Sequence, residues 1–239
     1  NEKLVRRHPH VYGDADGSEK GGADRSIVSR GPLEVDNWSE SLRSLPVWQM
    51  SGSFFVCGFT TLIMSVHFVP YAIDVGVSPN VAATIFGVMM GLNVLGGLGS
   101  GVLAERFGRK NVLAAAYFIR GCGYIALLLA PSTLGLWIFA GFGGMSWIAT
   151  VSLTNTLTAD VYGIRSLGTL TGITFFCHQI GGLLGVLLGG YFYDLTGSYT
   201  RPFAIVGSML FPAALCVFTI KERKYSTRYY TELAVAASS

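Results

Sequence analysis

One stretch decides the fold of this chain: GVLAERFGRK, which runs from Gly101 to Lys110 between two long apolar runs. Within it, two glycines frame a tight cluster of charged side chains that includes Glu105, Arg106 and Arg109. The rest of the chain is strongly apolar. Of its 239 residues 51% are hydrophobic and 13% are charged, about half of the roughly 25% charged residues that soluble domains carry. With 31 glycines, which suit closely packed membrane helices, this composition predicts an integral membrane protein.

Outward from that stretch, the chain contains six apolar runs, each long enough to cross a membrane as a helix of about 20 residues. They cover residues 47–70, 81–104, 111–130, 134–158, 167–192 and 202–220. The runs are continuous rather than alternating, which favours helices over the strands of a barrel. We therefore expect an all-α membrane protein with a polar cytoplasmic segment at 1–45, a six-helix bundle at 46–220 and a cytoplasmic tail at 221–239.

The positive charges predict how the bundle lies in the membrane. Of the 17 Lys and Arg residues, Arg201 alone falls on one side and Arg120 falls inside a run, while all the others flank the opposite ends. Because Lys and Arg concentrate on the cytoplasmic side, we expect both termini and the charged stretch in the cytoplasm. The predicted location is the bacterial inner (plasma) membrane, as a multi-pass protein.

The charged stretch has an echo later in the chain. The spacing G-xxx-[DE]-xx-G occurs twice, each time after a glycine-rich run: Gly101, Glu105 and Gly108 in the first copy, and Gly190, Asp194 and Gly197 in the second. Gly96 and Gly185 also stand at equivalent offsets, whereas the basic cluster is absent from the second copy. Runs one to three and four to six therefore resemble two copies of one unit. Because three is an odd number, the second copy has inverted topology, which predicts a 3+3 inverted repeat.

Glycines four residues apart recur along these runs. They are Gly87 and Gly91, Gly97 and Gly101, Gly168 and Gly172, and Gly181, Gly185 and Gly189. This spacing places the small residues on one helix face, where two backbones can approach closely. Since the second and fifth runs carry most of these pairs, we expect these two to be interior helices that pack on several sides.

GVLAERFGRK resembles the loop motif of the major facilitator superfamily, G-x-x-x-D-R-x-G-R-[RK], and departs from it only at Glu105. A 3+3 inverted repeat is also the plan of one six-helix half of these transporters. Three further stretches resemble the C-terminal half of monocarboxylate and oxalate/formate-type members: RRHPHVYGDADG, HFVPYAIDVGVSP and CHQIGGLLGVLLGGYFYDLTGSY. The resemblance implies spans seven to twelve of a secondary transporter, with residues 1–45 as its central loop and an N-terminal half missing.

The resemblance also implies a function. We expect alternating-access transport of a small organic solute, with an organic anion such as a carboxylate favoured. Neither an enzymatic reaction nor a cofactor is expected, although a proton or an anion is a candidate for coupling. The expected partners are the solute, the missing N-terminal six-helix half and membrane lipids, but no nucleic acid. The charged turn, Gly101, Glu105, Arg106, Gly108, Arg109 and Lys110, would act as a conformational latch, and an anchor that only sets topology is the alternative.

Few polar side chains lie at membrane depth, and each is a candidate either for the solute site or for helix packing. The candidates for solute binding are His178, Gln179, Asn93, Arg120, His67 and Tyr71. His178 and Asn93 lie near mid-membrane, where a hydrogen bond to a neighbouring helix is the alternative role. His67 and Tyr71 lie four apart on one helix face, at the outer end of the first run, and could form part of a gate. No acidic residue lies inside a run, which disfavours a proton pump built on a buried carboxylate.

Arg120 presents a conflict. It lies about ten residues into the third run, a depth at which a charge is costly and suggests function. The third helix of each unit is peripheral in the fold that the motif implies, so snorkelling or a bond to a backbone carbonyl is the competing account. The resembled monocarboxylate carriers place a charge pair in the eighth helix, but the second run here has no charged residue before Glu105. Asp160 and Arg165 flank the turn after the fourth run and are expected either to pair locally or to contact the charged turn.

Other classes of membrane protein remain as alternatives. They are a receptor or scaffold component that does not transport, a homodimeric six-helix carrier and a six-span channel. A channel would show rings of pore-lining residues or re-entrant filter segments, which the sequence lacks. An enzyme is disfavoured because the sequence contains no phosphate-binding loop, metal-ligand cluster or nucleophile constellation, and its four cysteines are widely spaced within apolar runs.

Overall fold

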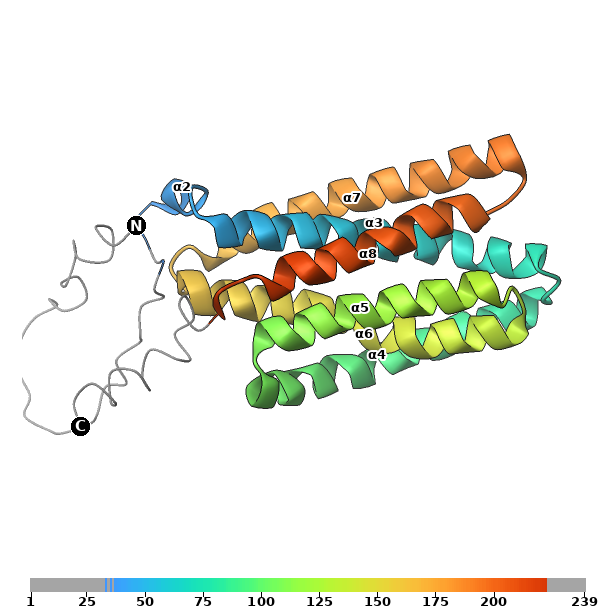
Figure 1. Cartoon of the computed structure of the whole chain (residues 1–239), viewed down its shortest axis with the longest axis horizontal. Helices are drawn as coiled ribbons and strands as arrows, with labels where there is room; N and C mark the ends of the chain where they lie inside the picture. Colours follow the sequence, from blue (N-terminus) through green and yellow to red (C-terminus); the bar gives the residue numbers. More distant parts are fainter. Residues whose placement is uncertain (1–32, 34, 36, 223–239) are drawn as a thin grey trace, which may run out of the picture.

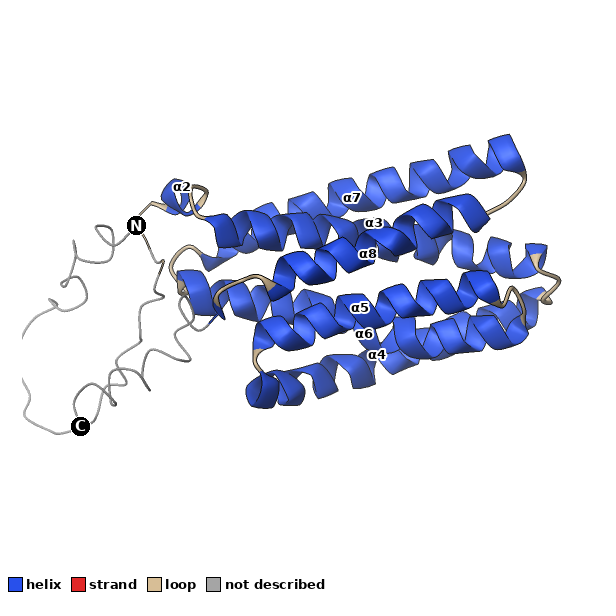
Figure 2. Cartoon of the chain, in the orientation of Figure 1, coloured by secondary structure: helices blue, strands red, loops and turns tan. Residues whose placement is uncertain are grey.

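The computed structural model describes residues 33, 35 and 37–222, and these residues form helices and short connections without strands (Figure 2). A one-turn helix, α2 (Trp38–Ser41), precedes six long helices: α3 (Leu45–Asp74), α4 (Pro79–Phe107), α5 (Arg109–Leu129), α6 (Thr133–Tyr162), α7 (Leu167–Thr196) and α8 (Thr200–Phe218). Each of the six is long and apolar enough to cross a membrane. The all-α, six-span prediction is confirmed, and every helix end lies within four residues of its predicted position.

The second helix of each three-helix unit ends in the same way. Gly108, with φ 90°, follows α4, and Gly197, with φ 64°, follows α7. A residue with a Cβ would be strained at such a positive φ, which explains why glycine stands at both points. Gly197 follows Gly108 by 89 positions, the same offset that separates Gly190 from Gly101 in the sequence echo.

Helices of one three-helix unit pack mainly against helices of the other unit. The six helices run side by side along the long axis of the bundle (Figure 1). In this bundle α7 packs mainly against α3, and α4 packs mainly against α6. The second helix of each unit therefore packs on the first helix of the other unit, while α5 contacts both α6 and α8. This exchange is the arrangement that a 3+3 inverted repeat requires.

Two close helix crossings repeat by the same symmetry. A Cβ at Gly96 would overlap the backbone carbonyl of Met145, and a Cβ at Gly185 would overlap that of Phe59. Gly185 follows Gly96 by 89 positions, and Met145 follows Phe59 by 86. The second helix of each unit therefore makes an equivalent contact with the first helix of the other unit. Each contact has a glycine on one side, because only a glycine allows the two backbones to approach so closely. The inverted repeat is present in the packing as well as in the sequence.

The expectation that the second and fifth runs are interior helices is wrong for this chain. The buried share is 28% for α4 and 33% for α7, against 56% for α6. A Cβ at Gly87, Gly91, Gly168 or Gly172 would meet no atom of the described chain, so these pairs lie on uncovered faces. Glycine spacing marks faces that permit close packing, but it does not say whether the packing partner belongs to the same chain.

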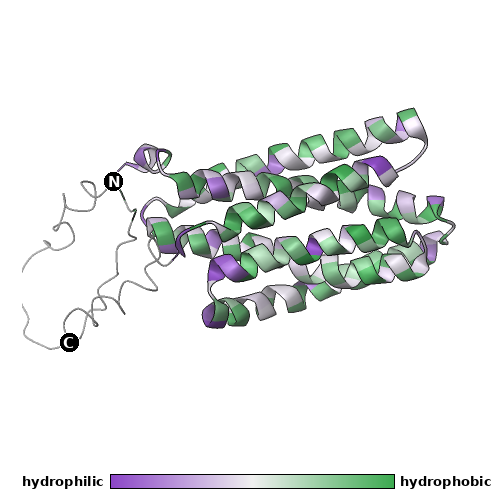
Figure 3. Ribbon diagram, viewed as in Figure 1, coloured by the Kyte–Doolittle hydropathy of each residue, from purple (hydrophilic) through white to green (hydrophobic). Residues whose placement is uncertain are grey.

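Hydrophilic residues gather at the ends of the helices, while the shafts are mostly apolar (Figure 3). At one end α2 is joined to α3, where the Trp48 Nε1 donates to the Leu42 carbonyl at 2.7 Å. Most of the predicted polar segment at 1–45, and all of the tail at 221–239 except Lys221 and Glu222, lie outside the described residues. Those two domain assignments stay predictions.

Candidate functional site

Arg120 extends from α5 into the centre of the bundle, where its side chain is fully buried. On the side of α6 its Nε donates to the Ser146 hydroxyl at 3.1 Å, and its Nη2 donates to the Ser146 carbonyl at 2.7 Å. The same Nη2 donates to the Thr150 hydroxyl at 3.0 Å. The guanidinium is thus held inward against α6 and does not snorkel toward the membrane surface, although one of its bonds goes to a carbonyl, as the competing account expected.

On the side of α3 the same guanidinium makes longer contacts. Its Nη1 lies 3.3 Å from the Thr61 hydroxyl, 3.4 Å from the Thr60 hydroxyl and 3.5 Å from the Cys57 sulfur. These partners are hydroxyl groups, a backbone carbonyl and a cysteine sulfur, and within the described residues no carboxylate pairs with Arg120. A full positive charge at mid-membrane without a counter-charge is costly, and such residues usually mark a functional site.

His178 reaches the same region from α7. Its ring lies beside the Cys57 thiol, and its Nδ1 is 3.0 Å from the Gln179 amide oxygen. The ring is buried and stacks parallel to Phe175, with ring centroids 5.5 Å apart. Gln179 is exposed on the surface of α7.

Four helices therefore converge on one set of side chains, which we call the central polar cluster. It consists of Cys57, Thr60 and Thr61 on α3, Arg120 on α5, Ser146 and Thr150 on α6, and His178 and Gln179 on α7. Sequence reasoning named Arg120, His178 and Gln179 but missed the hydroxyl and thiol groups between them. Small polar residues are common on membrane helices, so nothing in their local sequence set these apart.

Asn93 lies outside the central polar cluster and joins α4 to α6. Its Oδ1 accepts from the backbone N–H of Ile148 at 3.1 Å, and its Nδ2 donates to the Met89 carbonyl at 3.3 Å. The amide is buried. The structure thus shows the helix-to-helix bond that was the alternative role for this residue.

His67 and Tyr71 lie at the other end of α3 from the charged turn. The His67 Nε2 donates to the Val186 carbonyl at 3.1 Å, which leaves Nδ1 to accept from the Tyr199 hydroxyl at 3.4 Å. Burial raises the pKa of Tyr199, so that hydroxyl stays protonated and able to donate. The Tyr71 hydroxyl donates to the Leu127 carbonyl at 3.2 Å.

These side chains belong to a second group, which we call the outer aromatic cluster: His67, Tyr71, Tyr193, Tyr199 and Phe203. Tyr193 and Tyr199 are stacked across the turn between α7 and α8, with ring centroids 4.4 Å apart. The cluster ties α3 to α7 and α8. Both predicted gate residues are buried in it.

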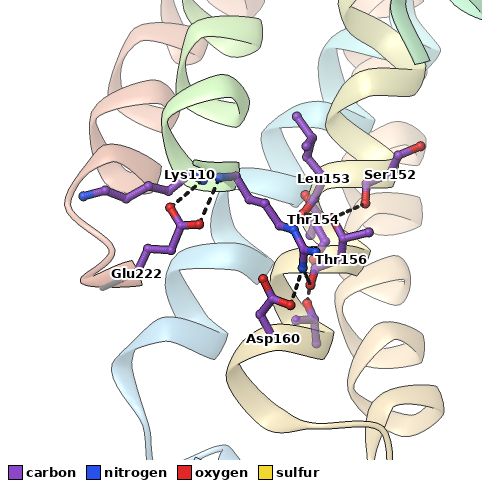
Figure 4. Close-up of polar contacts among 9 residues, drawn as sticks. Lys110, Ser152, Leu153, Thr154, Thr156, Asp160 and Glu222 are labelled. Atoms are coloured by element: carbon purple, nitrogen blue, oxygen red, sulfur yellow. Dashed lines mark hydrogen bonds and ion pairs between the residues drawn. The ribbon is translucent and has the colours of Figure 1, made fainter. Parts of the chain in front are cut away.

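The charged turn between α4 and α5 is tied to α6 by Arg109. Its guanidinium forms an ion pair with Asp160 and donates to the Thr156 carbonyl at 2.8 Å. Figure 4 shows Asp160 and Thr156 side by side on α6 at this point. Of the two roles weighed for Asp160, contact with the charged turn is confirmed.

Glu222 binds the start of α5. Its carboxylate accepts from the backbone N–H groups of Arg109 at 2.9 Å and of Lys110 at 3.1 Å (Figure 4), and the residue is buried. A carboxylate at a helix N-terminus neutralises the unpaired N–H groups there. Glu105, the acidic residue of the charged turn itself, is exposed and caps no helix in the part of the chain that the structure describes. Glycine at position 108 offers α5 no capping side chain of its own, and Glu222 supplies the acceptor instead.

The remaining cations of the charged turn differ in their contacts. The Lys110 Nζ donates to the Phe218 carbonyl at 3.0 Å and lies over the Phe218 ring, so it caps the end of α8. Arg106 is exposed, with its guanidinium 5.5 Å from the ring centroid of Phe107. A Cβ at Gly101 would meet no atom of the described chain. The turn thus joins α5, α6 and α8 at one end of the bundle.

Comparison with known proteins identifies the family. A family model described as Major Facilitator Superfamily matches residues 5–186 and, in a second alignment, residues 49–233. The chain belongs to the Major Facilitator Superfamily. It is 35% identical over 170 residues to the uncharacterized MFS-type transporter YcxA of Bacillus subtilis. This alignment covers 68% of this chain and 41% of YcxA. It is also 30% identical over 190 residues to monocarboxylate transporter 12-B of Danio rerio, covering 75% of this chain and 38% of the relative.

Solved structures of the superfamily share the fold. A crystal structure of the peptide transporter POT in complex with sulfate matches with a TM-score of 0.66 and 18% identity, over 81% of this chain and 42% of that one. The Escherichia coli fucose:proton symporter matches with a TM-score of 0.61 and 20% identity, over 76% of this chain and 45% of the symporter. This member of the superfamily therefore spans less than half the length of the transporters it matches, which agrees with a six-helix half.

Proposed function

We propose that the chain forms a six-helix half of a secondary transporter that moves a small organic anion, such as a carboxylate, by alternating access. The observation that carries the proposal is Arg120, a buried guanidinium at mid-membrane that has no carboxylate among its partners in the described chain. An anionic solute would supply the missing counter-charge at the depth where transporters of this plan bind their substrates. The similarity to monocarboxylate transporter 12-B supports a carboxylate as the class of solute.

The side of the central polar cluster that faces α3 and α7 is where a solute could approach the Arg120 guanidinium. The three Nη1 contacts on the side of α3 are long, at 3.3–3.5 Å, and one of them goes to Thr61, which is only partly buried. On α7 the exposed Gln179 stands next to His178. We infer that the carboxylate binds between Thr61 and Gln179, with His178 as a further donor and Arg120 supplying the positive potential. Hydrogen bonds to charged groups each contribute about 1.5–3 kcal/mol.

The charged turn is proposed to act as a latch in the transport cycle. Arg109, Lys110 and Glu222 bind the start of α5 to α6 and to the end of α8. Sliding of these helices against each other would break and remake the Arg109–Asp160 ion pair, so the pair would favour one state of the cycle. By the positive-inside rule we place this turn and both termini in the cytoplasm, in a bacterial inner membrane.

A second six-helix half is proposed to complete the solute site. The uncovered glycine faces of α4 and α7 suit close packing against further helices. The chain purified alone is expected to show no saturable transport, since half of the site wall would be absent. Saturable transport by a dimer of this chain alone would replace the two-half account with a homodimeric carrier.

Uptake into vesicles by the complete transporter that contains this chain tests the proposal. A panel of labelled short carboxylates, a neutral sugar and an organic cation would be compared, and saturable uptake is expected for a carboxylate. Arg120→Gln should reduce that uptake at least about tenfold, because 1.4 kcal/mol corresponds to a factor of ten, whereas Arg120→Lys should retain more of it. The matched control is Arg201→Gln, which removes an exposed cation at the end of the bundle away from the charged turn. Equal uptake by a correctly folded Arg120→Gln protein would exclude the proposed role.

A further inference from the structure

An apolar groove lies on the outside of the bundle, and Ser146 is the residue that it shares with the central polar cluster. It has a volume of 460 Å³ and runs between α4 and α5, with α6 as its floor. α4 and α5 leave the charged turn together (Figure 1), and both pack against α6 but little against each other. The groove therefore begins beside the charged turn, at Phe107 on α4, and extends along α4 as far as Leu95.

The walls of this groove suit hydrocarbon rather than a polar solute. Its polar lining residues are Ser100, Asn111 and Ser146. Ser100 and Ser146 each donate a hydrogen bond to a carbonyl of their own helix, at 2.8 and 3.0 Å, and the Asn111 amide donates to the Phe107 carbonyl at the end of α4 at 2.9 Å. Ser146 also accepts from Arg120, so its hydroxyl is used on both sides. The groove consequently offers an occupant little beyond apolar contact, which burial of methylene groups would make favourable.

The end of the groove beside the charged turn carries a cation. Phe107 forms part of the wall there, and the guanidinium of Arg106 lies 5.5 Å from the centroid of its ring. Within the described residues Arg106 forms no ion pair, in contrast to Arg109, which is bound to Asp160. An apolar slot that ends in an exposed cation matches a molecule with a hydrocarbon chain and an anionic head.

We propose that the groove holds one acyl chain of an anionic phospholipid from the leaflet beside the charged turn, with the phosphate of its headgroup on Arg106. The α4 wall from Leu95 to Phe107 extends about 18 Å at 1.5 Å per residue. That length is close to the hydrocarbon thickness of one leaflet, about 15 Å or half of a 30 Å core. An anionic lipid surface attracts basic residues near the membrane, and the groove confines this attraction to one site.

Native mass spectrometry of the purified protein, titrated with phosphatidylglycerol or phosphatidylcholine, tests the acyl-chain part of the proposal. Gly99 lines the groove, and a Cβ there would meet no atom within 4 Å, so the side chain in Gly99→Leu has open space to enter the slot. We expect one tight phosphatidylglycerol adduct, weakened at least about tenfold by Gly99→Leu, since losing the burial of two methylenes has that effect. Gly52→Leu is the control, because a Cβ at Gly52 would also meet no atom within 4 Å and this residue lies on α3, outside the groove.

Substitution of Arg106 tests the proposed contact between its guanidinium and the phosphate of the lipid headgroup. Arg106→Gln should weaken phosphatidylglycerol binding roughly fivefold and leave phosphatidylcholine binding nearly unchanged. Arg201→Gln, which removes an exposed cation near the opposite end of the bundle, should change neither. Equal lipid binding by the wild type and by both Gly99→Leu and Arg106→Gln would overturn the proposal. So would a change of oligomeric state in Gly99→Leu with unchanged lipid binding, because the groove would then be covered by a second copy of the chain.

Discussion

The turns that follow α4 and α7 share a glycine with positive φ and one backbone hydrogen bond, but they differ in ψ, which is 145° at Gly108 and 20° at Gly197, and in side-chain chemistry. After α4, the N–H of Gly108 donates to the Ala104 carbonyl at 3.0 Å, and after α7 the N–H of Gly197 donates to the Tyr193 carbonyl at 2.7 Å. Both donors and both acceptors are separated by 89 positions. The first turn is then held by charges that reach three helices, whereas the second is held by stacked aromatic rings.

The inverted repeat thus preserves the glycine and the hydrogen bond that end each helix, whereas the side chains that hold each turn differ. Buried ring stacking depends little on ionic conditions. A partly exposed ion pair is weak enough to break and re-form, and salt screens its attraction. The charged turn is therefore the better suited of the two to contacts that the proposed transport cycle would break and remake, and the outer aromatic cluster is better suited to permanent packing.

The strongest test of the repeat compares its equivalent glycines. Gly96→Ala and Gly185→Ala each bring a Cβ into a backbone carbonyl of the opposite unit, so each should destabilise the bundle by about 3 kcal/mol. Thermal unfolding in detergent would measure the loss, with Gly87→Ala, at an open position, as the control. If one of the two substitutions were as harmless as Gly87→Ala, the two crossings would not be energetically equivalent.

The next largest effect concerns the cap of α5 in the charged turn. Glu222→Ala removes a buried carboxylate that accepts from two backbone N–H groups, so it should cost about 2 kcal/mol of unfolding free energy. Glu105→Ala removes an exposed carboxylate of the same turn and should change stability by less than about 0.5 kcal/mol. The same unfolding assay applies, and equal effects of both substitutions would show that the cap contributes nothing specific.

A smaller effect is expected in the outer aromatic cluster. Tyr199→Phe retains the stacked rings but removes the hydroxyl that donates to His67, which should cost about 1 kcal/mol at any salt concentration. Tyr191→Phe, at an exposed position on α7, is the matched control. A loss that disappears at high salt would mean that this end of the bundle is also held by charge.

The smallest effect belongs to the Arg109–Asp160 ion pair. A double-mutant cycle with Arg109→Gln and Asp160→Asn should give a coupling of about 0.5 kcal/mol, because both side chains are partly exposed. The coupling should fall as salt rises from about 0.1 M to about 1 M, where the screening length drops from about 10 Å to about 3 Å. A coupling that does not respond to salt would contradict the contrast between the two turns.

Much of the fold could be predicted from the sequence because its signals are local. Apolar length predicted the six helices, and the repeated glycine spacing predicted the inverted units. The central polar cluster could not be predicted in the same way. The inward direction of Arg120 depends on how α3 and α6 pack around α5, and Glu222 reaches the start of α5 from more than a hundred residues away. The same limit applies to the uncovered faces of α4 and α7, since glycine spacing does not reveal which faces the chain itself covers.

The central claim is that a buried, uncompensated cation makes the solute an anion. Competition for uptake in the complete transporter tests this claim without any substitution, by comparing a transported carboxylate with its primary amide. The two compounds have nearly the same shape but differ in charge. The account predicts that unlabelled carboxylate abolishes uptake of the labelled form, while the amide at the same concentration competes at least about tenfold less well. Equal competition by the amide would contradict the claim, because recognition would then not depend on the negative charge that Arg120 is proposed to attract.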